Sequence, residues 1–205
     1  VLFLQGGAST QFAMVPLNFL TEGKAAHYIL SGSWAKKAVK EAENIGKTVI
    51  AAQEEQFTKV PDFSGINLEG NAAYLHITSN ETIEGIQYKS FPETGNVPLI
   101  ADMSSDILCR PIDVSQFDLI YAGAQKNLGP SGVTIVILKE DLLDNIPGHI
   151  PTMLRYDTHV KANSLYNTPP AFSVYMVKLV LEWVKENGGL AAMEQKNKEK
   201  TDLIY

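Results

Sequence analysis

The 205-residue chain is 45% hydrophobic and 20% charged, with a formal net charge of -6, which is the balance of an ordinary globular protein. This charge disfavours a nucleic acid or an anionic membrane as partner, and no apolar run approaches the roughly 20 residues that span a bilayer. A single cysteine excludes an internal disulfide and favours a reducing compartment such as the cytoplasm, and with only four scattered histidines we expect no metal site.

The first half of the chain alternates short apolar runs with helical patterns. A Gly-rich loop, residues 5–10, precedes a helix at residues 11–20, which Pro16 should disturb because proline lacks the backbone donor. Ser31-Gly32-Ser33 offers an N-cap to a second helix that runs from residue 34 to about residue 44. The apolar runs predict strands at residues 1–4, 27–30, 47–52 and 74–78.

The second half adds strands at residues 99–101, 119–122 and 133–138. The last two lie too close together for a helical crossover, so we expect them to be antiparallel in an otherwise parallel sheet. A short helix is expected at residues 140–146 and a long loop at residues 147–170. A stronger helix covers residues 171–186, with one apolar face made by Met176, Leu179, Val180 and Trp183. The alternation predicts an α/β fold with a mainly parallel, mixed sheet.

The Asn187-Gly188-Gly189 stretch ends that helix and is the best candidate for a domain boundary. We therefore expect residues 1–188 to form one domain and residues 189–205 to begin a second one. Because the chain starts inside an apolar run and stops inside a helical one, we expect it to be the middle of a larger protein.

Asp102 and Lys126 follow strands at the edge of the sheet where ligands bind in open α/β folds. Asp102 could be an ordinary N-cap or turn residue, or a buried carboxylate kept ionised by a cation such as a protonated pyridine nitrogen. Lys126 could be a solvated loop residue. If it is desolvated near a cation, its pKa falls, and the amine can then form a Schiff base.

Two further features complete a set. The loop Gly6-Gly7-Ala8-Ser9-Thr10 opens a helix, so its N–H groups suit a phosphate, although a plain tight turn explains it as well. Trp34 begins a helix after a strand, where an aromatic side chain either fills the core or stacks on a flat heterocycle. Phosphate loop, carboxylate, lysine and indole together are what pyridoxal 5'-phosphate (PLP) requires.

Residues 121–143, YAGAQKNLGPSGVTIVILKEDLL, resemble the active-site region of the phosphoserine aminotransferase family, which are class V, fold-type I PLP enzymes. Further stretches agree in order along the chain: GGASTQFAMVPLN, SGSWAKKAVKEA, NETIEGIQ, ADMSSDILCRPIDV, YNTPPAFSVY and WVKENGGLAAMEQKN. The resemblance implies a three-layer α/β/α large domain, incomplete at both ends, followed by the start of a small domain.

By this resemblance, Lys126 is the catalytic lysine that forms the Schiff base with PLP and shuttles the proton. Asp102 would pair with the pyridinium nitrogen, Trp34 would stack on the ring, and Thr82 would hydrogen-bond the phenolic oxygen. The phosphate would be contacted by Ala8, Ser9 and Gln125. Where this chain has Ser9 the family often has an arginine, so contacts there would be weaker or made by the backbone alone.

Asn167 and Thr168 match residues that reach the phosphate from the neighbouring subunit, which implies a homodimer with shared sites. Without the resemblance they would read as a turn before two prolines. The family binds its substrates through arginines and a histidine in segments that have no match here. Arg110 is expected to be structural, and the role of Arg155 stays open.

The implied reaction interconverts O-phosphoserine plus 2-oxoglutarate with 3-phosphohydroxypyruvate plus glutamate, in serine biosynthesis. In many bacteria the same family also acts on 4-phosphohydroxythreonine in pyridoxine biosynthesis. Two alternatives remain open at this point: another class V aminotransferase, for example one acting on alanine and glyoxylate, and a non-catalytic fragment that binds PLP.

Overall fold

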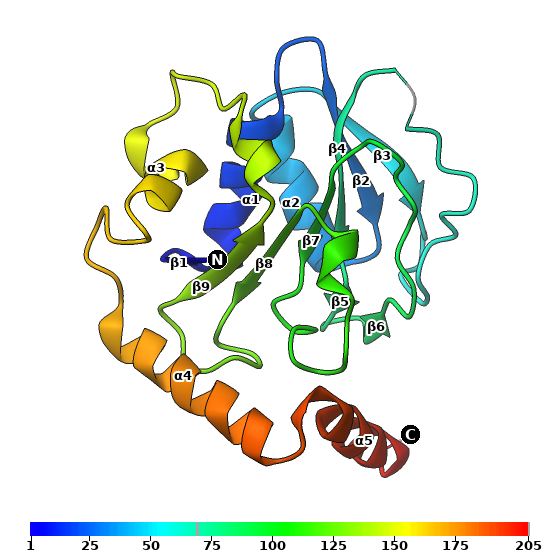
Figure 1. Cartoon of the computed structure of the whole chain (residues 1–205). Coiled ribbons are helices and arrows are strands. Elements are labelled where there is room, and N and C mark those ends of the chain that lie inside the picture. The colour runs from blue at the N-terminus through cyan, green and yellow to red at the C-terminus, as the bar shows by residue number, and fades with distance from the viewer. Residues whose placement is uncertain (69, 205) are drawn as a thin grey trace.

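A seven-stranded mixed sheet runs through the computed structural model, which describes residues 1–68 and 70–204 (Figure 1). Its strands, in spatial order, are β1 (Leu2–Leu4), β9 (Thr134–Leu138), β8 (Leu119–Gly123), β7 (Leu99–Asp102), β4 (Ala72–Thr78), β2 (Ala25–Leu30) and β3 (Thr48–Gln53). A separate two-stranded pair joins β5 (Asn80–Glu81) to β6 (Ile86–Gln87).

The direction of the strands determines at which edge of the sheet the loops after them lie. The pairs β2–β3, β2–β4, β4–β7 and β7–β8 are parallel. β9 is antiparallel to both β8 and β1, so β1 points the same way as the parallel strands. The predicted antiparallel pairing of β8 with β9 in a mainly parallel sheet is confirmed, and the antiparallel pairing of β9 with β1 comes in addition. As a result, β1, β2, β3, β4, β7 and β8 all end at the same edge of the sheet.

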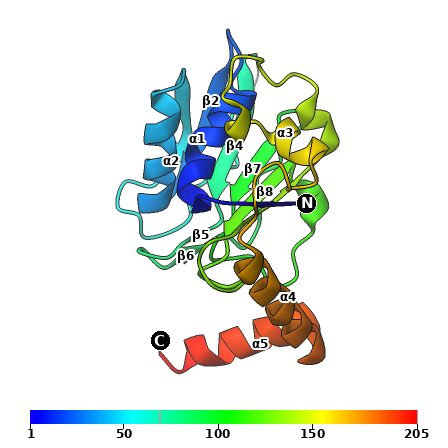
Figure 2. The same ribbon diagram turned by 90° about the vertical axis from the view of Figure 1, so that its left-hand side faces the viewer.

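Helices α1 (Gly7–Phe19) and α2 (Ser33–Glu43) lie together on one side of the sheet, as Figure 2 shows. On this face, alternate strand residues such as Tyr28, Tyr74 and Tyr121 form one buried cluster with residues of both helices. The opposite face, with Ile29 and Leu75, is covered mainly by residues from irregular segments. Alternation of side chains across each strand therefore separates the core into two layers.

Helix α1 begins four residues earlier than expected. Gly6 is the N-cap, in a left-handed conformation with φ +91°, and the predicted loop is the first turn of the helix. Pro16 does not end the helix, which continues to Phe19. Proline removes a single backbone hydrogen bond there, and its ring is buried in the packed face of α1, which offsets the loss.

The stretch predicted as a loop at residues 147–170 contains a 3-10 helix, Thr152–Leu154, and α3 (Tyr156–Lys161). Contacts with α1 order this segment. Asn18 donates to the Leu154 carbonyl at 2.7 Å and accepts from the Tyr156 N–H at 3.1 Å, and the Tyr156 hydroxyl donates to Gln11 at 2.6 Å. These partners are far away in sequence, so local pattern could not reveal them. The short helix expected at 140–146 is a 3-10 turn, Glu140–Leu143.

Helix α4 (Ala171–Glu186) has the predicted bounds but not the predicted buried face. Val177 and Val184 are buried, whereas Leu179 and Trp183 are 36% and 51% exposed. Among its contacts with the described residues, Val177 packs on Gly129 and the Ser173 hydroxyl donates to the Ser131 carbonyl at 2.9 Å. Gly188 and Gly189, both at positive φ, then lead into α5 (Gly189–Asp202). The domain boundary here stays a prediction.

Both helices extend away from the sheet (Figures 1 and 2). Among the residues that the structure describes, no helix is long and apolar enough to cross a membrane.

Candidate active site

Three side chains meet where the strands end. The amine of Lys126 donates to the hydroxyl of Thr82 at 3.1 Å, and the indole N–H of Trp34 donates to the same oxygen, also at 3.1 Å. Lys126 Nζ lies 4.8 Å from the centre of the Trp34 ring, within the range of a cation–π contact. Lys126 and Thr82 lie on two different turns and Trp34 lies in the first turn of α2, and the structure brings the three side chains together.

Of the two alternatives left open for Lys126, the structure of the single chain shows the solvated one. Lys126 is exposed, as are its neighbours Gln125 and Asn127. Strand β8 ends at Gly123, so the lysine stands beyond the packed sheet, on the turn that follows. What holds the amine is its hydrogen bond to Thr82 and the indole face beside it.

Asp102 is the last residue of β7 and only 5% exposed. Its Oδ1 accepts the backbone N–H of Ser104 at 2.9 Å and the Ser104 hydroxyl at 2.6 Å. Burial raises the pKa of this carboxyl, while the Ser104 bonds and the charge of Lys126 oppose the rise. Lysine and carboxylate therefore lie on the same side of the sheet, close enough for their charges to interact.

Ser104 joins two strands at this edge. Besides donating to Asp102, its hydroxyl accepts the backbone N–H of Gly123 at 3.0 Å. Gly123 ends β8, three residues before Lys126. The carboxylate and the lysine are thus positioned by the same buried hydroxyl.

The N-cap of α2 is Gly32, inside the predicted Ser31-Gly32-Ser33 stretch, in an extended conformation and without a side-chain cap. Two carboxylates from the β5–β6 hairpin bind the first N–H groups instead: Glu81 accepts from the N–H groups of Trp34 and Ala35, and Glu84 accepts from that of Ser33. Since the first N–H groups of a helix have no partner inside it, these carboxylates fix the start of α2.

Ala8 and Ser9 lie in the first turn of α1, directly after Gly6 and Gly7, whose φ angles are +91° and +66°. Gly6 has no room for a side chain, because a Cβ there would lie 2.7 Å from the Cβ of Thr10. Thr10 folds back to donate to the Gly6 carbonyl at 3.0 Å. The N–H groups at this helix start face the same sheet edge as Lys126, as an anion site requires.

The remaining predicted residues are exposed. The Gln125 side chain folds against Gly123, where a Cβ would lie 2.8 Å from its Oε1. Asn167 and Thr168 lie on the segment that leads into α4, and the Thr168 carbonyl accepts from Gln5 at 2.8 Å. Within one chain this places both residues beside the loop that begins α1. Whether they serve a neighbouring subunit stays a prediction.

Comparison with known proteins identifies the architecture. The whole of residues 1–205 matches the family described as aminotransferase class-V. The chain belongs to this family.

This class-V aminotransferase chain is 64% identical, over 207 aligned residues, to the phosphoserine aminotransferase of Niallia circulans. It superposes with a TM-score of 0.97 and 64% identity on the phosphoserine aminotransferase from Bacillus circulans subsp. alkalophilus. In both comparisons all of this chain is covered, but only 57% of the relative. A PLP-bound phosphoserine aminotransferase from Trichomonas vaginalis gives a TM-score of 0.90 at 40% identity, covering 97% of this chain and 57% of that one.

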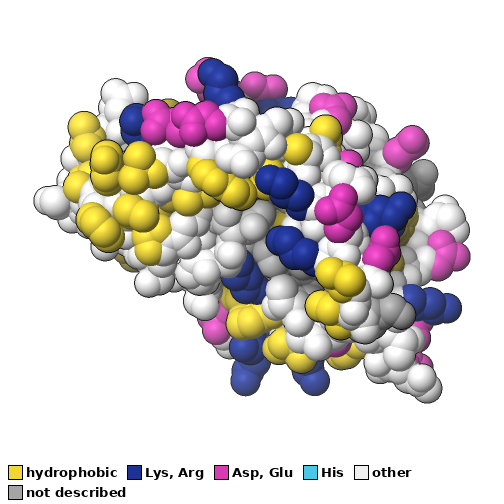
Figure 3. Space-filling view, turned by 90° about the horizontal axis from the view of Figure 1, so that it is seen from below, with side chains coloured by type: hydrophobic (Ala, Val, Ile, Leu, Met, Phe, Trp, Pro, Cys, Tyr) yellow, Lys and Arg dark blue, Asp and Glu magenta, His cyan; other side chains and the backbone are white. Residues whose placement is uncertain are grey.

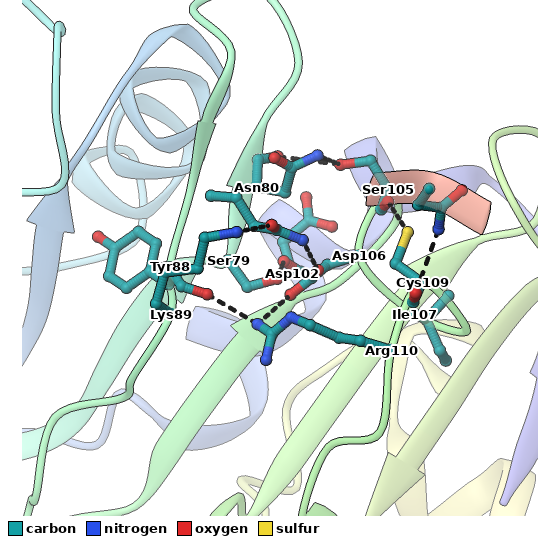
Figure 4. A network of polar contacts seen from close by, with 12 residues as sticks. Ser79, Asn80, Tyr88, Lys89, Asp102, Ser105, Asp106, Ile107, Cys109 and Arg110 are labelled. Atoms are coloured by element: carbon teal, nitrogen blue, oxygen red, sulfur yellow. Dashed lines mark hydrogen bonds and ion pairs between the residues drawn. The ribbon is translucent and has the colours of Figure 1, made fainter. Parts of the chain in front are cut away.

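A polar network that the sequence did not reveal joins residues 80–88 to residues 105–110, next to the site of this class-V aminotransferase (Figure 4). The side chain of Asn80 and that of Ser105 are 2.9 Å apart, and Gln87 donates to Asp106 at 2.7 Å. Arg110 donates to the Tyr88 carbonyl at 2.7 Å and pairs with Asp106 at 3.3 Å. These contacts agree with the structural role expected of Arg110, because they tie the segment after β6 to the loop after Asp102.

Sequence reasoning also missed a buried pair beneath Asp102. His76 Nε2 and the Tyr121 hydroxyl are 2.8 Å apart, and strand register places both on the same face as Asp102. Burial lowers the pKa of His76 to about 3, so this imidazole is neutral at physiological pH. The residues around His76 in the sequence do not indicate this contact, because only the pairing of the strands brings His76 close to Tyr121.

Proposed function

We propose that this chain is the cofactor-binding part of a PLP-dependent aminotransferase that interconverts O-phosphoserine plus 2-oxoglutarate with 3-phosphohydroxypyruvate plus glutamate. The main support for PLP as cofactor is the contact of the Lys126 amine with Thr82 and Trp34, near the buried carboxylate of Asp102. The substrates rest on the 64% identity to phosphoserine aminotransferases. Because the chain spans 57% of those relatives, the proposal concerns the whole protein to which it belongs.

The residues present fit PLP. Both Ser104 donors go to Asp102 Oδ1, and among residues 1–68 and 70–204 no donor reaches Oδ2. A carboxylate oxygen in this state, on an aspartate that is only 5% exposed, suits a protonated ring nitrogen. The start of α1 offers N–H groups to a phosphate, and the indole of Trp34 offers a flat apolar surface. Each recognisable part of PLP thus has a partner at this edge.

PLP, when bound, supplies an electron sink for charge that develops on the substrate carbon. Lys126 would be the amine that attaches to the aldehyde carbon and then carries the proton at Nζ. Asp102 would keep the ring nitrogen protonated, and Thr82 would hold the phenolic oxygen. Trp34 would stack on the ring. Ala8, Ser9 and Gln125 would contact the phosphate.

A homodimer is the second part of the proposal. Asn167 and Thr168 are exposed on the segment before α4, as residues that complete a neighbour's phosphate site must be. Sedimentation of the full-length protein should give a dimer. PLP affinity should fall in Asn167→Ala without loss of the folded dimer, and an unchanged affinity would argue against a shared site.

The lysine assignment can be tested with a matched control. Lys37 also lies over Trp34, 4.1 Å from the ring centre, but on α2. After incubation with PLP and reduction with borohydride, mass spectrometry should find phosphopyridoxyl on the peptide with Lys126. Lys126→Ala should lose the adduct, whereas Lys37→Ala should keep it. An adduct that persists in Lys126→Ala overturns the assignment.

Substrate class is tested separately with the full-length protein. We expect amino transfer from phosphoserine to 2-oxoglutarate to exceed transfer from alanine to glyoxylate. The reverse preference would leave the PLP site standing but replace the proposed substrates.

A further inference from the structure

Glu81 has no role in the function proposed above, although it lies beside the site. Its exposed fraction is 0%, and it directly precedes Thr82. Its two carboxylate oxygens accept from the N–H groups of Trp34 and Ala35, at 2.9 and 2.8 Å. A side chain from the β5–β6 hairpin therefore holds the start of α2, far away in sequence.

Trp34 is fixed at two points by adjacent residues of this hairpin. Glu81 holds its backbone N–H, and Thr82 accepts its indole N–H at 3.1 Å. Thr82 also accepts from Lys126. The hairpin is itself closed by a bond from the Gly85 N–H to the Glu81 carbonyl at 2.8 Å. Any displacement of Glu81 would thus reach the indole, the hydroxyl and the amine together.

The fit around Glu81 leaves little slack. A Cβ at Gly32 would lie 2.7 Å from both Cγ and Cδ of Glu81, so only glycine lets α2 approach the carboxylate this closely. Burial raises the pKa of Glu81 to about 7, and the N–H groups of Ala35 and Trp34 oppose that rise. The two N–H donors therefore favour the ionised form of a carboxyl that burial alone would protonate.

We infer that Glu81 is a positioning residue: its carboxylate sets the plane of the Trp34 indole and, through Thr82, the place of the Lys126 amine. The effect of Glu81 on PLP binding rests on the proposed function. The effect of Glu81 on the position of the Trp34 indole does not require a bound cofactor and is measured without one.

The test compares two carboxylates at the same helix end, in the full-length protein. Glu81→Gln replaces one acceptor oxygen by an amide that cannot accept an N–H. Glu84→Gln makes the same change in a residue that holds Ser33 and has no bond to Trp34 or Thr82. Thermal unfolding reports the loss of helix capping in each. Fluorine NMR of 5-fluorotryptophan-labelled, cofactor-free protein reports the indole, with the Trp34 signal assigned by its absence in Trp34→Phe.

We expect Glu81→Gln to move or broaden the Trp34 signal and to raise the PLP dissociation constant about tenfold, because a displaced indole would stack less well on the ring. Glu84→Gln should leave both unchanged. If the two variants behave alike in signal and affinity, the inference is overturned. Wild-type protein that binds no PLP would instead remove the proposed function, and the fluorine signal would still decide whether Glu81 holds the indole.

Gly32→Ala provides a second variant should Glu81→Gln fail to fold. Its methyl group would push the Glu81 side chain away, and with it the Glu84 Oε2 that would lie 2.9 Å from the new Cβ, without removing any charge. We expect the Trp34 signal to shift in the same sense as in Glu81→Gln. An unmoved signal in folded Gly32→Ala would count against the inference.

Discussion

The edge of the sheet and helix α4 differ in what they bury. At the edge, polar groups are enclosed and bonded: Asp102 is 5% exposed, Ser104 5% and Glu81 0%. On α4, large apolar side chains face outward, including Phe172 at 72% and Trp183 at 51%. Figure 3 shows hydrophobic side chains gathered over this helix.

The difference separates the site from the helix. Among residues 1–68 and 70–204, the hydrogen bonds that position Asp102, Thr82 and Trp34 come from residues before α4, so these three side chains are held in place without the helix. The exposed apolar face of α4 is not needed for that geometry. Breaking the site and breaking the helix should accordingly give separate effects.

Replacing Asp102 should have the largest effect, and in opposite directions on activity and stability. Asp102→Asn keeps an acceptor for Ser104 but loses the charge, so we expect amino transfer by the full-length protein to fall at least about a hundredfold. The folded-state pKa of Asp102 is raised by burial, so its stabilising contribution is complete below the unfolded pKa and is lost as pH rises through the folded value. Cofactor-free Asp102→Asn should therefore melt higher than wild type at pH 7.

The same melts repeated near pH 4 give the control, because the two proteins should converge there, where the aspartate is increasingly protonated. If Asp102→Asn melts lower than wild type at neutral pH, the charge of Asp102 stabilises the folded protein, and the prediction is wrong.

Ser104→Ala should have the next largest effect. It leaves the buried Gly123 N–H without its acceptor and removes one donor from Asp102, at a cost of about 1–3 kcal/mol in the free energy of unfolding. Ser105→Ala is the matched control, since Ser105 bonds Asn80 at a less buried position. Urea unfolding should rank wild type, Ser105→Ala and Ser104→Ala in falling order. Equal losses in the two variants would mean that Ser104 has no special place at the edge.

Local pattern was sufficient for most strands and for the bounds of α4. The antiparallel β8–β9 pair followed from the short connection alone, and the convergence of Lys126, Thr82 and Trp34 followed from strand direction together with family resemblance. Such features depend on periodicity and on short stretches of sequence, both of which are visible in one chain.

What failed depended on partners far along the chain. The carboxylates that bind the first N–H groups of α2, Glu81 and Glu84, lie about fifty residues away, and no local rule selects them. The buried face of α4 depends on which stripe meets Gly129. The exposure of Lys126 stayed open because it depends on the segments around the turn and not on the residues of the turn itself.

Helix α4 offers a smaller test of the same contrast. Val177→Ala removes a side chain that is 2% exposed, which should lower the free energy of unfolding of the 205-residue chain by about 2 kcal/mol. Leu179→Ala removes a larger side chain that is 36% exposed, and should change it by less than about 0.5 kcal/mol. Chemical denaturation of the two variants measures both. A greater loss for Leu179→Ala would show that the helix is packed on its outward face.

The smallest effect is expected away from both regions, at the start of α3. Arg155 donates two hydrogen bonds to the Asp157 carboxylate, at 2.9 and 3.0 Å, and Lys161 donates a third at 2.9 Å. The Arg155 bonds, with the Lys161 bond and both charges, lower the pKa of Asp157. Its contribution to stability is therefore present above the unfolded pKa and is lost as pH falls through the folded value. Because the pair lies near solvent, Asp157→Asn should cost less than about 1 kcal/mol at pH 7. That difference from wild type should shrink on acidification, whereas a constant difference between pH 7 and pH 2 would assign the effect to packing and not to charge.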